Sequence, residues 1–349
     1  MKRFSIIYIF FLLMITFSCT KEKRSFGVSF QTSVEQSAIS KAVVTGSSLP
    51  TGSSIGVFVY HAETKNSPMT NFSDYGEKYT NIKGDRNSAG KWEYTLRGGG
   101  TPFQNFFLIK PTIEGGTGAL AICAYSPYTQ EATSIKNIPF TLGGNHSKLT
   151  DLMWAEQNKN SDNLYITPTG GTQEIPLTFK HALSMLVLDF KCQNEGTTMT
   201  ISSIRIKKNG ATPLYLSGEF NAVDGTFPSL VPVGEDGLLF SLENDNFTFN
   251  HSGLINNKYE SFGGIPLLIV PVDNYQNDGD YVIEFTFNGQ TLATKYAIRV
   301  NDIIKEGTSK FARGYTYKFK FVFDNYAQIK NIGVSVVETW GKDNYEMVF

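Results

Sequence analysis

Apolar and polar residues alternate along most of this chain, and that two-residue period limits it to folds built from β-strands. Residues 26–34 (FGVSFQTSV) and 315–323 (YTYKFKFVF) alternate in this way, whereas 54–61 and 265–272 are almost continuous apolar runs. Successive side chains point to opposite faces of a strand, so the first pattern predicts half-buried strands and the second predicts buried ones. Long helical periodicity is nearly absent. The sequence therefore predicts an all-β protein.

Turn signals separate these segments at close spacing, which favours β-sandwiches or barrels. Glycine-rich stretches such as LRGGGTPF and EGGTGA divide the strands, and Asn288-Gly289 predicts a primed two-residue turn in a hairpin over residues 281–300. Aromatic residues make up 13% of the chain and charged residues 18%. Aromatic side chains suit pleated, half-buried surfaces, so this composition is typical of an exported β-protein.

The chain is long enough for two domains, with 349 residues. The stretch PTGGTQE at 168–174 is the best candidate linker, and a new apolar block follows it. We therefore expect an N-terminal β-sandwich over residues 26–175 and a C-terminal β-sandwich over residues 176–349.

The first 18 residues have the character of an export signal. Lys2 and Arg3 precede an apolar run that ends near Phe17, which is shorter than the roughly 20 residues of a membrane span. Cys19 follows at once, in a sequence that resembles a relaxed bacterial lipobox. This predicts a signal peptide at 1–18 and a lipidated Cys19 on a charged tether, residues 19–25. Several buried acyl chains would anchor such a chain to a membrane. The alternative is an ordinary secretory signal with an incidental cysteine.

The two remaining cysteines, Cys123 and Cys192, lie in apolar stretches far apart in the sequence. We expect two buried free thiols, although an exported protein could also form a disulfide. No CxxC motif or Cys/His metal spacing is present.

Residues that could carry catalysis or bind a charged polymer are few. Without Lys2 and Arg3 the chain has 29 basic and 32 acidic residues, a net charge of −3, and no basic aromatic stripe for nucleic acid. None of the four histidines lies in HExxH, and no GxSxG motif occurs. The segment VDNYQNDGDY lacks the full calcium-loop pattern, so a hairpin turn is the preferred interpretation. We expect no enzyme activity, no metal and no cofactor.

Several segments together resemble the fimbrillin family of Bacteroidales, the Mfa-like pilins. The likeness runs over most of the chain in family order. It rests on Lys41-Ala42 before SIGVF at 54–58, AYSPY at 124–128, DLMWAE at 151–156, Phe179 with His181 and Ala182, the stretch ISSIRIKKN at 201–209, FARGYTYKFKF at 311–321, and VVETW at 336–340.

This resemblance implies two tandem transthyretin-like β-sandwiches and a structural or accessory role in a cell-surface fimbrium that supports adhesion. Fimbrillins are exported through the periplasm as lipoproteins, reach the outer membrane surface, and are cut by an Arg- or Lys-directed protease. The cut removes the first strand, and a strand from the next subunit fills the groove. The implied partners are other fimbrial subunits, a membrane through the lipid anchor, and a host protein or glycan as a candidate ligand.

Two segments fit that scheme. Phe26, Val28, Phe30 and Val34 share one face of a candidate removable first strand, and Lys41 follows it as a candidate processing site. Cutting at Arg24, before the strand, would only release the protein from its lipid. The candidate donor strand carries Ile332, Val334, Val336 and Trp340 on one face. The alternative is that both segments are permanent strands of their own domains.

Two other kinds of function stay open. A surface glycan-binding lipoprotein that never polymerises would use exposed aromatic residues such as Tyr60, Trp92 or Trp154. A glycoside hydrolase would need two carboxylates that face each other in a cleft, about 5–10 Å apart.

Overall fold

Strands make up nearly all of the regular structure of this protein. The computed structural model describes residues 26–34, 49–62, 73–74, 76–104, 107–109, 119–142, 144–145, 151–156, 172–241, 246–255, 264–290, 292–305 and 308–337. Within these ranges the only helical elements are short 3₁₀ turns at Glu77–Tyr79 and Val300–Asp302. None of the helical segments found there is long and apolar enough to cross a membrane. The predicted all-β class is confirmed.

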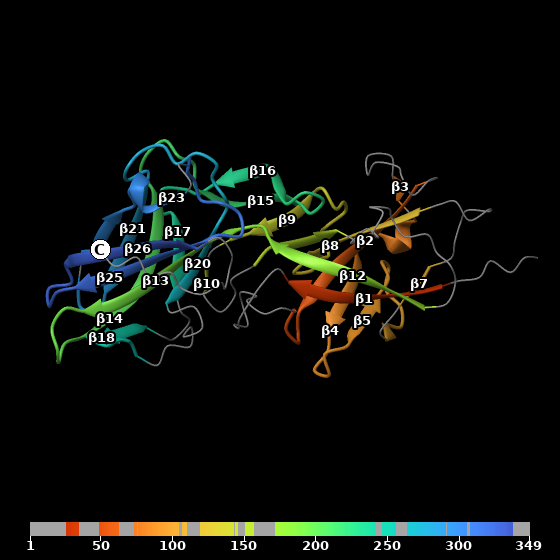
Figure 1. Ribbon diagram of the computed structural model, residues 1–349, viewed down its shortest axis with the longest axis horizontal. Coiled ribbons are helices and arrows are strands. Elements are labelled where there is room, and N and C mark those ends of the chain that lie inside the picture. Colours follow the sequence, from red (N-terminus) through yellow and green to blue (C-terminus); the bar gives the residue numbers. More distant parts are fainter. Residues whose placement is uncertain are drawn as a thin grey trace, which may run out of the picture.

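One large sheet collects strands from the first half of the chain, on the right in Figure 1. Its order is β6-β5-β4-β2-β8-β11-β12-β1-β7, and β3 pairs with β2. The bounds are β1 (Phe26–Val34), β2 (Ser54–Ala62), β3 (Ser73–Asp74), β4 (Ile82–Arg86), β5 (Trp92–Thr95), β6 (Phe103–Gln104), β7 (Phe107–Ile109), β8 (Ala119–Ser126), β11 (Met153–Glu156) and β12 (Thr172–His181).

Smaller sheets contain the second half of the chain, on the left in Figure 1. One has the order β20-β13-β25-β26, and another the order β10-β17-β14-β18-β19 with β21 and β22 attached through β14. A third sheet, β16-β15-β9, lies between the two ends of the molecule, and β23 pairs with β24. The bounds are β9 (Ile138–Thr141), β10 (Gly144–Asn145), β13 (Ser184–Cys192), β14 (Thr198–Lys208), β15 (Tyr215–Asn221), β16 (Thr226–Pro232), β17 (Leu238–Ser241), β18 (Phe247–Asn250), β19 (Gly253–Leu254), β20 (Ile265–Ile269), β21 (Tyr281–Phe287), β22 (Thr294–Ala297), β23 (Ile304–Lys305), β24 (Thr308–Ser309), β25 (Thr316–Phe323) and β26 (Ile329–Val337).

The sheets enclose two clusters of buried apolar residues. The smaller cluster belongs to the large sheet and includes Phe30, Val57 and Phe179. The larger cluster fills the C-terminal half and extends to Tyr125 of the large sheet. Within it the ring of Phe190 lies 5.6 Å from that of Phe285 and 5.9 Å from that of Phe321. Such aromatic pairs stabilise a core beyond their buried area. The alternation at 315–323 is confirmed, because β25 turns its aromatic side chains from 317 to 323 into this cluster.

The chain passes from one sheet to another within two residues. β12 belongs to the large sheet and β13 to the four-stranded sheet, with only Ala182 and Leu183 between them. β9, from the first half of the sequence, pairs with β15 from the second half. The expected division into domains at residue 175 stays a prediction.

Both described cysteines are buried and free, as expected. Cys123 is in β8 and Cys192 ends β13, so each occupies an apolar position of a strand. Burial raises the pKa of the Cys192 thiol, which keeps it protonated and unreactive at neutral pH.

The predicted hairpin is confirmed, but its predicted primed turn is wrong. β21 and β22 pair with Phe285 opposite Thr294, which leaves a longer connection than two residues. Gly289 has a positive φ of 80°, and Asn288 has none, although a type I′ turn requires both. The reason lies in the neighbouring strand, because the Asn288 N–H donates to the Thr200 carbonyl of β14 at 2.9 Å.

The acidic loop before β21 is held together by its own carboxylates. Asp280 is 2% exposed and accepts hydrogen bonds from the Thr212 hydroxyl, the Ala211 N–H (3.0 Å) and the Asn277 N–H (3.3 Å). Asp278 accepts from the Val300 N–H at 2.6 Å. In the part of the chain that the structure describes, no cluster of three or more potential metal ligands occurs. The carboxylates of this loop thus fix its backbone and that of the neighbouring segments.

Replacing Asp280 with Asn should destabilise the protein by about 1–3 kcal/mol at pH 7, because the new NH₂ would face N–H donors. Burial raises the pKa of Asp280, but the hydrogen bonds from Thr212, Asn277 and Ala211 lower it more, so it lies below its ordinary value. The contribution of Asp280 is therefore present above the ordinary pKa near 4 and is lost as the pH falls through the lowered one. Urea unfolding should show that the difference in free energy of unfolding between the parent chain and Asp280→Asn shrinks as the pH is lowered from 7 to 3.

The matched control for this change is Asp236→Asn. The Asp236 side chain is 99% exposed and lies 3.7 Å from Arg205, so its loss should change stability by less than about 0.5 kcal/mol at every pH. Equal effects of the two substitutions would contradict the role given to Asp280.

Candidate functional site

The first strand is inserted between segments that come much later in the sequence. β1 pairs in parallel with β12, from Gly27 opposite Thr172 to Val34 opposite Phe179. At its other edge, residues 26–28 pair antiparallel with β7. Sequence analysis predicted the strand but identified neither partner. The parallel partner could not be identified because parallel strands are not joined by a short turn, so no local turn signal marks the pair. The antiparallel partner, β7, is only three residues long and has no clear sequence pattern.

Phe30 anchors this strand in the core of the large sheet. Its side chain is 5% exposed and belongs to the same cluster as Ile175 and Leu177 of β12. Its ring meets that of Tyr94 edge-on, with 5.5 Å between the ring centroids. Burying one phenylalanine stabilises a protein by about 1.5–3 kcal/mol. Removal of β1 would lose this stabilisation and leave an apolar cavity at the position of Phe30.

A polar contact joins the far end of the same pair of strands. The Ser33 and Thr178 hydroxyl oxygens lie 3.1 Å apart and share a hydrogen bond. Between Ser29 and Ser33, Phe30 is buried, Gln31 is exposed, and the other three side chains are half-buried. Of the four predicted apolar positions, Phe30 is the one whose burial the structure describes.

The candidate donor strand is β26, the last strand of the four-stranded sheet in the described part of the chain. Its one partner among the described strands is β25, with Val334 opposite Phe319 and Val336 opposite Tyr317. Ile332, Val334 and Val336 are half-buried and pack on the larger core. An edge strand with one paired side and partly exposed apolar residues is held less firmly than a central strand.

Several predicted site residues lie outside the described residues. These are Cys19, Arg24 and Lys41 at the N-terminal end, and Trp340 at the C-terminal end. In sequence, Lys41 follows the last residue of β1 by seven positions.

A buried contact between a histidine and an aspartate marks the junction between the large sheet and the C-terminal half. The Nδ1 atom of His181 lies 3.2 Å from a carboxylate oxygen of Asp151, and both side chains are almost fully buried. The Ala182 N–H donates to the Leu152 carbonyl at 2.8 Å, and the Lys180 ammonium lies 5.3 Å above the Trp154 ring. These contacts hold the chain at the corner where β12 ends and β13 begins, which is a structural role.

The segments used for the family resemblance therefore meet in space. DLMWAE contacts the segment with His181 through the Asp151 pair, and SIGVF at 54–58 pairs with AYSPY at 124–128 through Gly56 and Tyr125. Trp92, one of the aromatic residues considered for sugar binding, is 6% exposed and forms part of the core instead.

These observations define an all-β protein in which an N-terminal strand completes a sheet made by later segments. The family model for fimbrillin-like proteins matches residues 41–340. The protein belongs to the fimbrillin-like family.

Solved structures are similar to this chain, and the first of them has the same fold. A candidate cell adhesion protein from Bacteroides ovatus ATCC 8483 is 15% identical, with a TM-score of 0.52 and coverage of 91% of this chain and 99% of that chain. A fimbrial protein from Bacteroides vulgatus ATCC 8482 is 16% identical, with a TM-score of 0.44 and coverage of 91% and 99%. The comparison with curated proteins gave no match.

Proposed function

We propose that this protein is a structural or accessory subunit of a cell-surface fimbrium, exported as a lipoprotein and assembled by donor-strand exchange. Membership of the fimbrillin-like family supports the fimbrial role. The observation that carries the mechanism is the position of β1, the first described strand, which fills a slot between β12 and β7 and places Phe30 in the core. Its partners are other subunits of the same fimbrium, and the role is structural and needs no cofactor.

The N-terminal residues would act in sequence. Removal of residues 1–18 leaves the lipid-bearing Cys19 as the new N-terminus, and the tether at 19–25 holds the protein at the outer membrane after passage through the periplasm. Cleavage at Lys41 separates β1 from the rest of the chain. Cleavage at Arg24 alone leaves β1 attached and only frees the protein from its anchor.

A cut at Lys41 changes the energetics of β1. While it is covalently attached, the strand is present at an effective concentration of the order of millimolar, so it rebinds whenever it leaves. Once cut, it becomes a separate peptide that diffuses away after dissociation. A neighbouring subunit can then insert its own strand, which gains main-chain hydrogen bonds along the open edges.

The C-terminal strand has the spacing needed to take that place. Phe26, Val28, Phe30 and Val34 lie at steps of two, four and eight residues from the first, and Ile332, Val334, Val336 and Trp340 repeat the same steps. With this register Val336 would occupy the position of Phe30. Donation also requires β26 to leave β25. This departure is favoured because β25 is its single partner among the described strands.

The two halves of the chain would serve the two ends of this exchange. We propose that each half is a transthyretin-like sandwich, one supplying the groove and the other the donor. The change of sheet at Ala182 and Leu183 supports a division a few residues after the expected boundary between 26–175 and 176–349.

Cutting the unlipidated chain after β1 should produce polymers. A recognition site for a sequence-specific protease, placed in residues 35–41, allows a single cut there, and electrophoresis would detect a ladder of detergent-resistant, heat-labile oligomers. The matched control carries the same site in residues 20–24, before β1, and should stay monomeric after cutting. A monomeric product in both cases would contradict strand exchange.

A further inference from the structure

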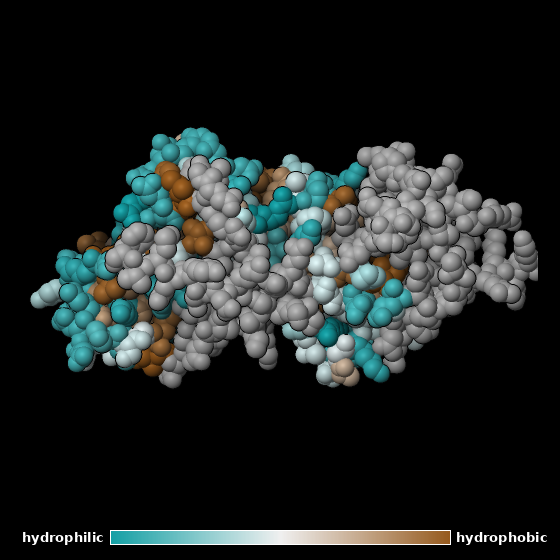
Figure 2. Space-filling view, in the orientation of Figure 1, coloured by the Kyte–Doolittle hydropathy of each residue, from teal (hydrophilic) through white to brown (hydrophobic). Residues whose placement is uncertain are grey.

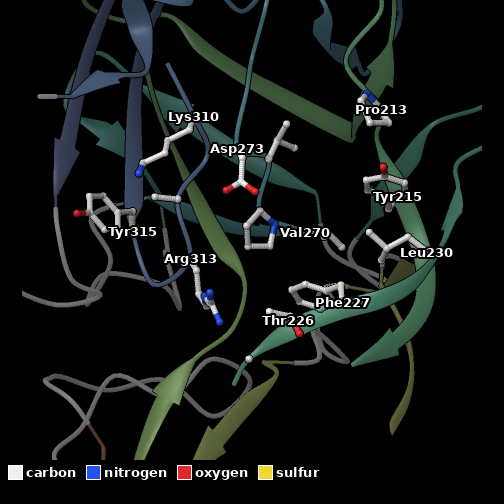
Figure 3. Close-up of a pocket in the computed structure, with 14 residues that line it drawn as sticks. Pro213, Tyr215, Thr226, Phe227, Leu230, Val270, Asp273, Lys310, Arg313 and Tyr315 are labelled. Atoms are coloured by element: carbon white, nitrogen blue, oxygen red, sulfur yellow. The ribbon is translucent and has the colours of Figure 1, made fainter. Parts of the chain in front are cut away.

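A cavity of about 640 Å³ lies in the C-terminal half, away from the groove of β1. One wall is the hairpin of β15 and β16, which contributes Tyr215, Phe227 and Leu230 (Figure 3). The facing wall is the loop before β25, which contributes Lys310, Arg313 and Tyr315, and Asp273 lies between the two walls. The volume falls in the range of about 300–1,000 Å³ that is typical of small-molecule sites.

The loop that carries the two cations is rigidly held. The Tyr317 hydroxyl donates to the Lys310 carbonyl at 2.6 Å and accepts from the Ala312 N–H at 2.7 Å. The Gly314 N–H donates to the Leu183 carbonyl at 2.8 Å. Burial raises the pKa of Tyr317 to about 12, so this hydroxyl keeps its proton at physiological pH. A ligand that binds here does not have to order the loop.

The aromatic wall is fixed as well. The ring of Phe227 packs 5.4 Å from that of Phe140 and 5.5 Å from that of Phe220, which ties β16 to the neighbouring strands. The Pro213 carbonyl accepts a hydrogen bond from the Tyr281 hydroxyl at 2.6 Å. Both walls are therefore in place before any ligand enters.

The positive charges of the cavity retain hydrogen-bonding capacity. Arg313 donates one N–H to the Asp224 carbonyl at 2.6 Å, which fixes its side chain and leaves other donors of the guanidinium for a ligand. Within the described residues the Lys310 ammonium makes no ion pair. Two cations against one carboxylate favour an anionic ligand, and a guanidinium binds a carboxylate through two parallel hydrogen bonds.

The shape of the walls favours a sugar over a peptide. Tyrosine, phenylalanine and proline present flat apolar surfaces that match the C–H faces of a pyranose ring, while Asp273 and the tyrosine hydroxyls match its hydroxyl groups. A peptide would pair with the strand edge beside the cavity. That edge is β16, where Pro228 and Pro232 lack the N–H groups that an added strand needs.

We propose that this cavity binds a carboxylate-bearing sugar of an acidic glycan, with Lys310 and Arg313 holding the carboxylate and Tyr215 packing against the ring. The site goes beyond strand exchange, because its residues belong neither to β1 nor to β26. It would give the fimbrial subunit an adhesive function of its own. Among the described residues of the cavity wall Asp273 is the single acidic one, whereas a glycoside hydrolase uses a pair of carboxylates.

The test is calorimetric titration of the full unlipidated chain with tetragalacturonate and with sialyllactose. The methyl ester of tetragalacturonate and lactose are the neutral counterparts, and tetraglutamate is the acidic peptide. We expect at least one acidic sugar to bind at least about 10-fold more tightly than its neutral counterpart, since charge-assisted hydrogen bonds carry such factors. Binding of neither acidic sugar, equal binding of the neutral partner, or equal binding of tetraglutamate would overturn the proposal.

Lys310→Gln should weaken that binding about 10-fold, and Arg313→Lys should weaken it by a similar factor because the two-pronged contact is lost. Lys91→Gln removes the same charge at an exposed turn of the large sheet and should leave the affinity unchanged. Unchanged affinity in Lys310→Gln would overturn the assignment. Polymerisation after cleavage should be the same in Lys310→Gln as in the parent chain. The proposal of glycan binding and the proposal of strand exchange are therefore tested independently.

Discussion

A chain whose first strand is tied to β12 by a disulfide should stay monomeric after cleavage, whereas the parent chain polymerises. The disulfide joins Ser33→Cys to Thr178→Cys. The two native hydroxyl oxygens are 3.1 Å apart on paired residues, so two sulfur atoms can reach each other there with little movement of the backbone. The expected loss of polymer is nearly complete, because a covalently held strand cannot be displaced.

The physical reason is that strand exchange is a competition for one slot. Phe30 and the ladder with β12 hold β1 in place, and the incoming strand offers a similar set of interactions. Nothing in such an exchange favours one strand strongly, so the outcome depends on whether the displaced strand can diffuse away. The disulfide removes that possibility without changing the apolar residues of the groove.

Reduction provides the internal control for this experiment. Adding a thiol reductant to the cleaved, locked protein should restore the ladder of oligomers. A second disulfide, between Thr200→Cys and Thr248→Cys, replaces a comparable hydroxyl pair at 3.3 Å between β14 and β18, far from the groove. That protein should polymerise whether oxidised or reduced. Polymers from the oxidised Ser33–Thr178 protein would show that β1 does not leave the groove during assembly.

The strands themselves could be predicted because their patterns are local. The alternation in 26–34 and 315–323 gives β1 and β25, and the apolar runs at 54–61 and 265–272 give β2 and β20. Each needs only that side chains alternate between two faces. The burial of Cys123 and Cys192 follows from the same reasoning, since each ends or interrupts an apolar strand.

Strand partners could not be predicted, because they depend on contacts between distant segments. β1 pairs with β12 across more than 100 residues, and β9 joins β15 in a sheet that links the two halves. The hairpin at 281–300 shows the same limit on a smaller scale. Its turn residues favour one geometry, and the hydrogen bond from Asn288 to Thr200 of β14 selects another.

The cavity could not be predicted from the sequence either. Lys310 and Arg313 lie in the segment KFARGYTY, whose alternation directs attention to the strand that follows. The aromatic wall comes from residues about 90 positions earlier. On the face shown in Figure 2, hydrophilic residues cover much of the described surface and apolar residues form small separate patches. Only the folded arrangement brings the aromatic and cationic residues to one place.

Gly56→Ala should be among the most destabilising single substitutions in the large sheet, with an expected loss of about 3 kcal/mol. A Cβ atom at Gly56 would lie 2.0 Å from the Tyr125 ring, which crosses the glycine on the neighbouring strand. That ring cannot move freely, because its hydroxyl donates to Asn81 at 2.7 Å and accepts from the Thr129 N–H at 3.2 Å. The substitution therefore forces either an overpacked core or the loss of buried hydrogen bonds.

Gly333→Ala is the matched control, since Gly333 also lies in a strand and a Cβ there would come no closer than 3.9 Å to Lys320. It should be neutral, or stabilising by up to about 1 kcal/mol, because alanine restricts the unfolded chain. Urea unfolding followed by tryptophan fluorescence would measure both proteins. Tyr125→Leu should destabilise the parent chain but cost at least about 1 kcal/mol less in the Gly56→Ala background, because the clash is then already relieved. Two results would contradict the packing of the Tyr125 ring on Gly56. One is strict additivity of the free-energy changes of Gly56→Ala and Tyr125→Leu, and the other is a Gly56→Ala protein as stable as Gly333→Ala.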